Sequence, residues 1–106
     1  MIRWANPMCY DQYMQKRGKK TMKAISKGRF TIEVYCILLS TNPESLLDIM
    51  NVNQLKFSYY KKQELYILGL AKSYEEALSL VKDMVEETYR ETGDVKLREY
   101  YQDRWD

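Results

Sequence analysis

Two pairs of carboxylates have a spacing compatible with acid–base chemistry. Glu44 and Asp48 are four residues apart, as are Glu87 and Glu91, and this spacing places two side chains on one side of a helix. The sequence contains no histidine, which is the commonest general base and the usual partner of a Ser or Cys nucleophile. Carboxylates at helical spacing usually belong to a solvated surface. We therefore expect no catalytic residue and predict that the protein is not an enzyme.

The two cysteines, Cys9 and Cys36, are too few for a disulfide framework or a structural zinc site. Cys36 lies in the longest apolar run, Val34–Leu39, and is expected to be a small buried side chain. Cys9 lies in a more polar segment. We expect no disulfide, no bound metal and no cofactor.

The basic residues are concentrated near the N-terminus. Residues 1–29 contain eight Lys or Arg side chains against Asp11 alone, a net charge of +7, and the remaining chain has a net charge of −5. Such a basic segment can follow a phosphate backbone. The candidate nucleic-acid contacts are Lys16, Arg17, Lys19, Lys20 and Lys23. The RNA-binding pattern of a basic residue, glycine and alternating aromatics is missing, so nucleic-acid binding is the second of two functional hypotheses.

A chain of 106 residues corresponds to one domain. Residues 1–28 lack sustained periodicity, because Pro7 and Gly18 interrupt them, and are predicted to form a poorly structured basic arm. The predicted domain spans 29–102, followed by a frayed tail, 103–106. A start at Met22 would remove much of the arm and turn the net charge negative.

Membrane and secretory signals are weak. No apolar run approaches the length of a membrane span, the basic arm has no sustained amphipathic pattern, and no secretory apolar region follows Arg3. We expect a cytoplasmic protein without a membrane partner.

Alternating and apolar residues predict three strands. The first runs from Phe30 to Leu39, the second spans 55–60 and the third spans 64–71. Gly69 within the third strand indicates a bulge or a close approach by another element. Between the first two strands, Asn42 and Pro43 predict the start of a short helix that ends near residues 51–53.

The clearest local signature begins at Ser73. Ser73 and Glu76 have the spacing of a capping box. The apolar residues from Ala77 onwards recur at three- and four-residue steps, which predicts an amphipathic helix that ends before Gly93. Beyond it, residues 95–102 form either a short helix or a fourth strand.

The predicted order is β-α-β-β-α, an α+β fold. We expect a two-layer sandwich in which a small mixed sheet carries both helices on one face. A fourth strand near residues 95–100 would make the fold ferredoxin-like; otherwise the chain ends in a short helix.

The second face of this sheet carries the first functional hypothesis. An exposed face should alternate with polar residues, but this one is apolar and rich in tyrosine. Its candidate interface residues are Tyr35, Ile37, Leu39, Tyr60, Tyr66 and Leu68. Because a patch of this kind usually marks an interface, we expect binding to a second copy or to another protein.

Two alternatives remain for the same face. Trp4, Tyr100, Tyr101 and Trp105 can cover it from within the chain. The sheet tyrosines can also stack on bases in the nucleic-acid hypothesis.

Overall fold

The sheet contains four strands in a mixed arrangement. A computed structural model of the chain describes residues 2–29, 33–39, 47–56, 62–94 and 96–101. Its strands are β1 (Ile2–Tyr10), β2 (Tyr35–Leu39), β3 (Leu47–Asn51) and β4 (Leu65–Ala71). They lie in the order β1-β4-β2-β3, with β1 parallel to β4 and the other two pairs antiparallel.

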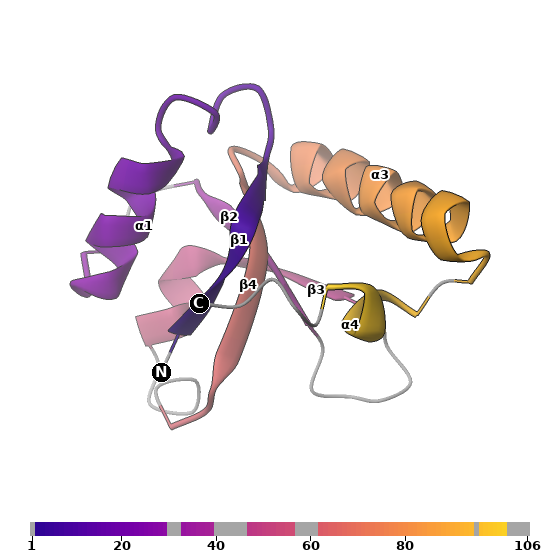
Figure 1. Cartoon of the computed structure of the whole chain (residues 1–106). Helices are drawn as coiled ribbons and strands as arrows, with labels where there is room; N and C mark the ends of the chain where they lie inside the picture. Colours follow the sequence, from indigo (N-terminus) through magenta and orange to yellow (C-terminus); the bar gives the residue numbers. More distant parts are fainter. Residues whose placement is uncertain (1, 30–32, 40–46, 57–61, 95, 102–106) are drawn as a thin grey trace.

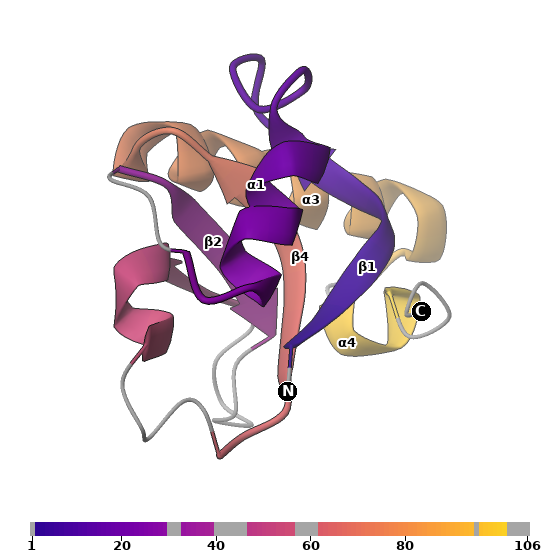
Figure 2. The same ribbon diagram turned by 90° about the vertical axis from the view of Figure 1, so that its left-hand side faces the viewer.

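Helices cover both faces of this sheet. Helix α1 (Gly18–Ser26) lies on one face, and α3 (Tyr74–Thr92) and α4 (Leu97–Tyr100) lie on the other (Figures 1 and 2). The predicted α+β fold with a small mixed sheet is confirmed. The helices are not confined to one face, however. Helix α1 covers the second face, and it lies in the segment that was predicted to be poorly structured.

The N-terminal segment belongs to the sheet. Strand β1 pairs with β4 on both sides of an irregularity between Trp4 and Cys9, and this interval contains Pro7, whose preceding peptide bond is cis. Proline has no N–H to donate to a strand ladder. The irregularity divides β1 into two short paired stretches. Neither stretch is long enough to show the sustained alternation by which a strand is recognised in a sequence.

Strand β3 occupies most of the segment for which a helix was predicted. Ile49 pairs with Ile37, and Leu47 pairs with Leu39, in an antiparallel ladder with β2. The helix prediction is therefore wrong for residues 47–51, because pairing with β2 outweighs the local pattern. Its proposed cap, Asn42 and Pro43, lies outside the described residues.

The second predicted strand, 55–60, is not observed where the structure describes it. Leu55 and Lys56 belong to the 3-10 helix η1 (Val52–Lys56). Residues 57–60 lie outside the described part of the chain.

The third predicted strand and the long helix are confirmed. In β4 the register shifts so that Ile37 pairs with Gly69 and Leu38 pairs with Ile67, which leaves Leu68 as a bulge. A Cβ atom on Gly69 would lie 2.9 Å from the carbonyl oxygen of Cys9. Gly69 therefore marks both a bulge and a close approach.

The predicted caps of the long helix also form. The Oγ of Ser73 accepts a hydrogen bond from the backbone N–H of Glu76 at 3.2 Å, and Gly93 ends α3 in the left-handed region with φ of 74°. After it, Leu97–Tyr100 is helical, so the short C-terminal helix is observed. The fourth strand of the sheet is β1, at the N-terminus and parallel to β4. The ferredoxin-like fold was predicted for a fourth strand near residues 95–100, and this condition is not met.

Two apolar cores result, one on each face of the sheet. The core beneath α1 includes Ile25 and Ile67, and the core beneath α3 includes Leu68 and Met84. The described chain thus forms three layers, with the sheet between α1 and the α3–α4 pair (Figure 2).

Candidate functional site

The predicted interface face is covered by the chain itself. Ile37 and Leu68 are fully buried and Leu39 is 5% exposed, and all three pack in the core beneath α3 with Ala77 and Met84. The sequence-based interpretation placed these residues on an open face. The structure leaves them almost no exposed surface.

The tyrosines of this face lie at its margins. Tyr35 is partly buried and makes an edge-to-face contact with Tyr74 of α3, at 6.1 Å between ring centroids. Tyr66 is also partly buried and donates its hydroxyl to Glu64 at 3.1 Å. Tyr60 lies outside the described residues. Neither described tyrosine forms an open platform for a base.

Part of the cover comes from the C-terminal aromatics, as the alternative interpretation anticipated. Tyr101 is 1% exposed, donates its hydroxyl to Glu87 at 3.1 Å and contacts Tyr100 edge to face. Trp4 packs in the core of the opposite face. Trp105 lies outside the described residues.

One of the two carboxylate pairs lies entirely within the described residues. Asp48 lies on strand β3 rather than on a helix, and Glu44 is outside the described residues. Glu87 and Glu91 lie on α3, where Glu87 accepts the hydrogen bond from Tyr101. Among the residues that the structure describes, no three His, Cys, Asp or Glu side chains gather as a metal site.

The two cysteines are free thiols. The Sγ of Cys36 donates to the carbonyl oxygen of Met50 at 3.4 Å, and burial raises the pKa of this thiol to about 12. A thiol with such a pKa stays protonated near neutral pH, so Cys36 is not an activated nucleophile. Cys9 is partly buried in the core beneath α3.

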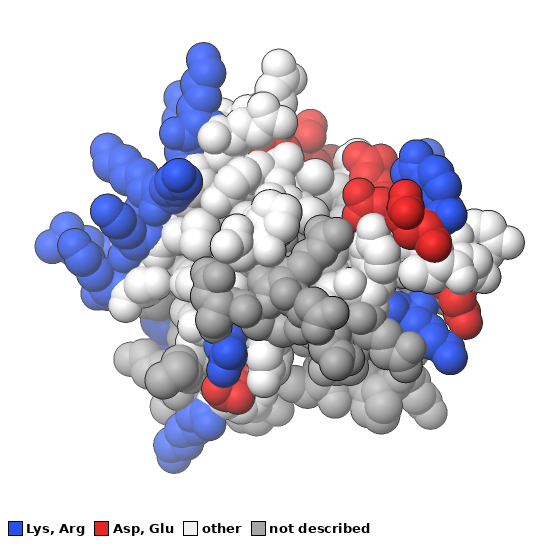
Figure 3. Space-filling model, in the orientation of Figure 1, with Lys and Arg blue, Asp and Glu red and all other residues white. Residues whose placement is uncertain are grey.

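The predicted nucleic-acid contacts do lie together on one surface. All five are exposed, at the start of α1 or along it, and Lys27 and Arg29 extend the set. We call this surface the basic face, and it consists of Lys16, Arg17, Lys19, Lys20, Lys23, Lys27 and Arg29. Figure 3 shows these positive side chains gathered over α1, while acidic side chains gather over α3. The uneven charge of the sequence is therefore also a separation in space.

The inner side of α1 is anchored to the sheet. Ile25 is 2% exposed, and the Sδ of Met22 accepts a hydrogen bond from the Tyr10 hydroxyl at 3.1 Å. Gly18 packs directly against the Tyr10 ring, where a Cβ atom would overlap it. This packing turns the lysines of α1 away from the core and toward solvent.

The charge pattern of the basic face does not stabilise α1. Its first turn contains Lys19 and Lys20 and no acidic residue, although the positive end of the helix dipole favours negative side chains there. Lys19 and Lys23 are like charges at i and i+4, an arrangement that weakens a helix. Helix stability therefore does not account for the lysines on this surface.

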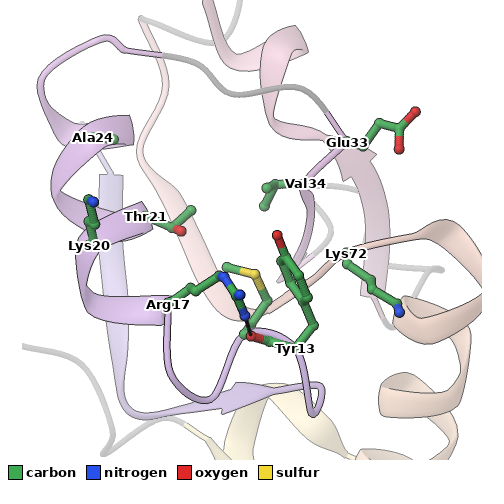
Figure 4. Close-up of a pocket in the computed structure, with 9 residues that line it drawn as sticks. Tyr13, Arg17, Lys20, Thr21, Ala24, Glu33, Val34 and Lys72 are labelled. Carbon is green, nitrogen blue, oxygen red and sulfur yellow. Dashed lines mark hydrogen bonds between the residues drawn. The ribbon is translucent and has the colours of Figure 1, made fainter.

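A groove adjoins the basic face where α1 approaches the β4–α3 junction. It has a volume of about 550 Å³ and is lined by residues of α1 and the turn before it, by residues 33 and 34, and by Lys72. Its polar lining consists of Tyr13, Arg17, Lys20, Thr21, Glu33 and Lys72 (Figure 4). Met14 and Val34 add apolar surface, so the groove combines cations, hydroxyl groups and an apolar wall.

Tyr13 stands between two cations in this groove. The Arg17 guanidinium lies over the ring at 4.1 Å from its centroid, and the Nζ of Lys72 is at 5.8 Å. Arg17 also donates to the carbonyl oxygen of Tyr13 at 3.2 Å. Contact with an aromatic face stabilises a cation, and the ring thereby interacts with two positive side chains from different segments of the chain.

A buried carboxylate places these residues next to one another. Asp11 is 5% exposed, and its side chain accepts hydrogen bonds from the N–H of Met14 at 2.8 Å and of Lys72 at 3.0 Å. The N–H of Asp11 also donates to the carbonyl oxygen of Leu70 at 3.3 Å. Asp11 therefore joins the turn that carries Tyr13 to the end of β4.

Sequence reasoning missed Tyr13 and Lys72 as members of a site. Lys72 lies between a strand and a cap, and nothing in the linear sequence relates it to Tyr13. The one available signal was Asp11, the single acidic residue among the first 29. Its partner at Lys72 depends on the position of β1 beside β4.

Comparison with known protein families, with curated protein sequences and with solved structures finds no match to this chain. Within the described residues, no helix has both the length and the apolar character that a membrane span requires. Functional conclusions therefore depend on the basic face and its groove.

Proposed function

We propose that this protein binds the phosphate backbone of a nucleic acid through the basic face. The observation that carries the proposal is the set of seven exposed Lys and Arg side chains between residues 16 and 29, with no acidic residue among them. Neutralisation of phosphates by such side chains releases bound counterions, which supplies affinity without base contacts. The basic face is thus suited to binding that depends on charge and salt rather than on sequence.

The dimensions of α1 fit this role. A helix of nine residues is about 14 Å long at 1.5 Å per residue, which matches the rise of about four nucleotides in one strand. Lys16 precedes the helix and Lys27 follows it, so the positive surface is somewhat longer than α1. Contact with several consecutive phosphates is sterically reasonable.

A membrane surface is a poorer partner for the same side chains. The apolar residues of α1, such as Met22 and Ile25, pack against the sheet. An interfacial helix needs an apolar stripe to insert among lipids. Helix α1 has no such stripe to offer while it is docked.

Protein–protein contact, the first hypothesis from the sequence, loses its main support because the apolar sheet face is covered. One kind of protein–protein contact remains possible for the described surface, in which the basic face of one copy binds the acidic α3 of another. This form predicts salt-sensitive self-association without nucleic acid. The prediction that the protein is non-catalytic and cytoplasmic is retained, and the free thiols are consistent with a reducing compartment.

The test is fluorescence anisotropy with labelled single-stranded and duplex DNA over a salt series. We expect the logarithm of the affinity to fall linearly with the logarithm of the salt concentration. Lys23→Gln should reduce the slope by about one, whereas Lys82→Gln on α3 makes the same charge change away from the basic face and should leave the slope unaltered. Affinity that is absent at low salt, or equal effects of both variants, would contradict the proposal.

A further inference from the structure

The groove has chemistry that the rest of the basic face lacks. Along α1 the exposed side chains are mainly flexible lysines, which neutralise phosphates without shaping a site. In the groove, Arg17 is held by a hydrogen bond and a ring contact with Tyr13. A guanidinium in these contacts presents a flat, exposed surface.

We infer that this groove receives one unpaired nucleotide, with its base stacked on the Arg17 guanidinium and its phosphate on the Lys20 side of the groove. The inference rests on the proposed function and narrows it to single strands. Arginine planes and aromatic rings are the usual stacking surfaces for unpaired bases. A base on Arg17 would extend the stack that Arg17 already forms with Tyr13.

The volume of the groove fits this occupant. At about 550 Å³ it lies within the range of small-molecule sites, roughly 300–1,000 Å³. A bare phosphate would not use the apolar wall formed by Met14 and Val34. A nucleotide has both an anionic part and a flat part with apolar faces, and so matches both kinds of lining.

The electrostatics of the groove also favour an anion. Arg17, Lys20 and Lys72 line the groove from two segments distant in sequence, and within the described residues none of them forms an ion pair with a carboxylate. The carboxylate of Glu33 lies at the rim and points away from Tyr13 (Figure 4). A phosphate therefore meets positive charge without a negative side chain aimed at it.

A duplex cannot use the groove in the same way. Its bases are paired and stacked, and entry of one nucleotide would require unpairing. The basic face can still contact the duplex backbone. The two modes of binding thus separate experimentally, because variants of the groove should affect single strands alone.

The experiment compares the full-length protein with Arg17→Lys on an oligothymidylate of about ten nucleotides and on a duplex of equal length. Lysine keeps the positive charge but has no plane on which a base can stack. We expect Arg17→Lys to weaken single-strand binding at least about fivefold with an unchanged salt slope, and to leave duplex binding within about twofold. Lys23→Gln is the matched control and should weaken both ligands together.

The outcomes separate the two proposals. Equal weakening of both ligands by Arg17→Lys would overturn the groove inference while leaving backbone binding intact. Absence of salt-sensitive affinity for either ligand would overturn the proposed function itself. If Arg17→Lys is unstable, Tyr13→Ala provides the second test: it removes the ring beneath Arg17 and should weaken single-strand binding while leaving duplex binding within about twofold.

Discussion

The side chain of Asp11 accepts a hydrogen bond from the backbone N–H of Lys72 at 3.0 Å, across 61 residues of sequence. This bond joins the turn after β1 to the junction between β4 and α3. Since Tyr13 and Arg17 follow Asp11 in the same turn, the bond also determines that the groove has cations on two sides. The geometry of the groove therefore depends on one buried carboxylate.

Asp11→Ala should lower the free energy of unfolding by about 2 kcal/mol, because loss of the carboxylate leaves the N–H of Lys72 without its acceptor. Urea unfolding followed by circular dichroism measures the change. Asp83→Ala removes the same charge from an exposed position of α3 and should alter stability by less than about 0.5 kcal/mol. Equal stability of the two variants would show that the Asp11 bonds contribute little.

Removal of residues 1–21 should prevent cooperative folding of the remainder. The deletion takes away β1, which pairs with β4, and Met14, which is fully buried beneath α1. It exposes an edge of β4 and part of the core on that face, which favours aggregation. Urea unfolding of the shortened chain tests this, and a cooperative transition at the midpoint of the full chain would contradict it.

Gly69→Ala should destabilise the protein by about 1–3 kcal/mol, as overpacking does elsewhere. The added Cβ would lie 2.9 Å from the Cys9 carbonyl oxygen, and two strand backbones would have to separate. Gly93→Ala is the informative comparison, because Gly93 has open space around it and φ of 74°. In Gly93→Ala the free energy of unfolding should fall by only about 1 kcal/mol, because of backbone strain. A smaller loss at Gly69 than at Gly93 in thermal unfolding would rule out the close approach.

Lys19→Glu should raise stability while weakening nucleic-acid binding. Glutamate in the first turn of α1 interacts favourably with the helix dipole and with Lys23 at i+4, which together stabilise by about 0.5–1 kcal/mol. Thermal unfolding and DNA anisotropy on the same preparation measure the two effects. A variant that is both less stable and unchanged in binding would contradict the interpretation of the basic face.

Alkaline conditions should destabilise the fold through Cys36. Its pKa is raised by burial from 9.0 to about 12, so the stabilising contribution is complete below pH 9 and is lost as the pH rises toward 12. Over that interval the free energy of unfolding should fall by about 1.4 kcal/mol per pH unit from this group. The slope should be smaller by this amount in Cys36→Ala, and identical slopes in the two proteins would refute the assignment.

Strand β4 and helix α3 could be predicted because their signals are local. Ser73 and Gly93 act within one turn of the helix ends, and the apolar spacing from Ala77 to Met84 repeats over several turns. The same holds for the bulge at Gly69. None of these features needs information from a distant part of the chain.

The two faces of the sheet were assigned incorrectly because a regular alternation of side chains was assumed across the bulge beside Gly69, and because the position of α1 is a tertiary feature. Leu68 and Leu70 would share a face in a regular strand, but the bulge directs them into different cores. The apolar face that was predicted to be open lies beneath α3, and α1 covers the other.

The sequence by itself determined the fold class, the caps of α3 and the concentration of positive charge near the N-terminus, since composition and short-range spacing are sufficient for these. Only the tertiary structure decided that β1 pairs with β4 and that Asp11 reaches Lys72. Strand pairing and long-range hydrogen bonds depend on which segments come into contact on folding. No local pattern in residues 1–28 specifies that this segment pairs with β4. The groove at Tyr13 exists because of this pairing.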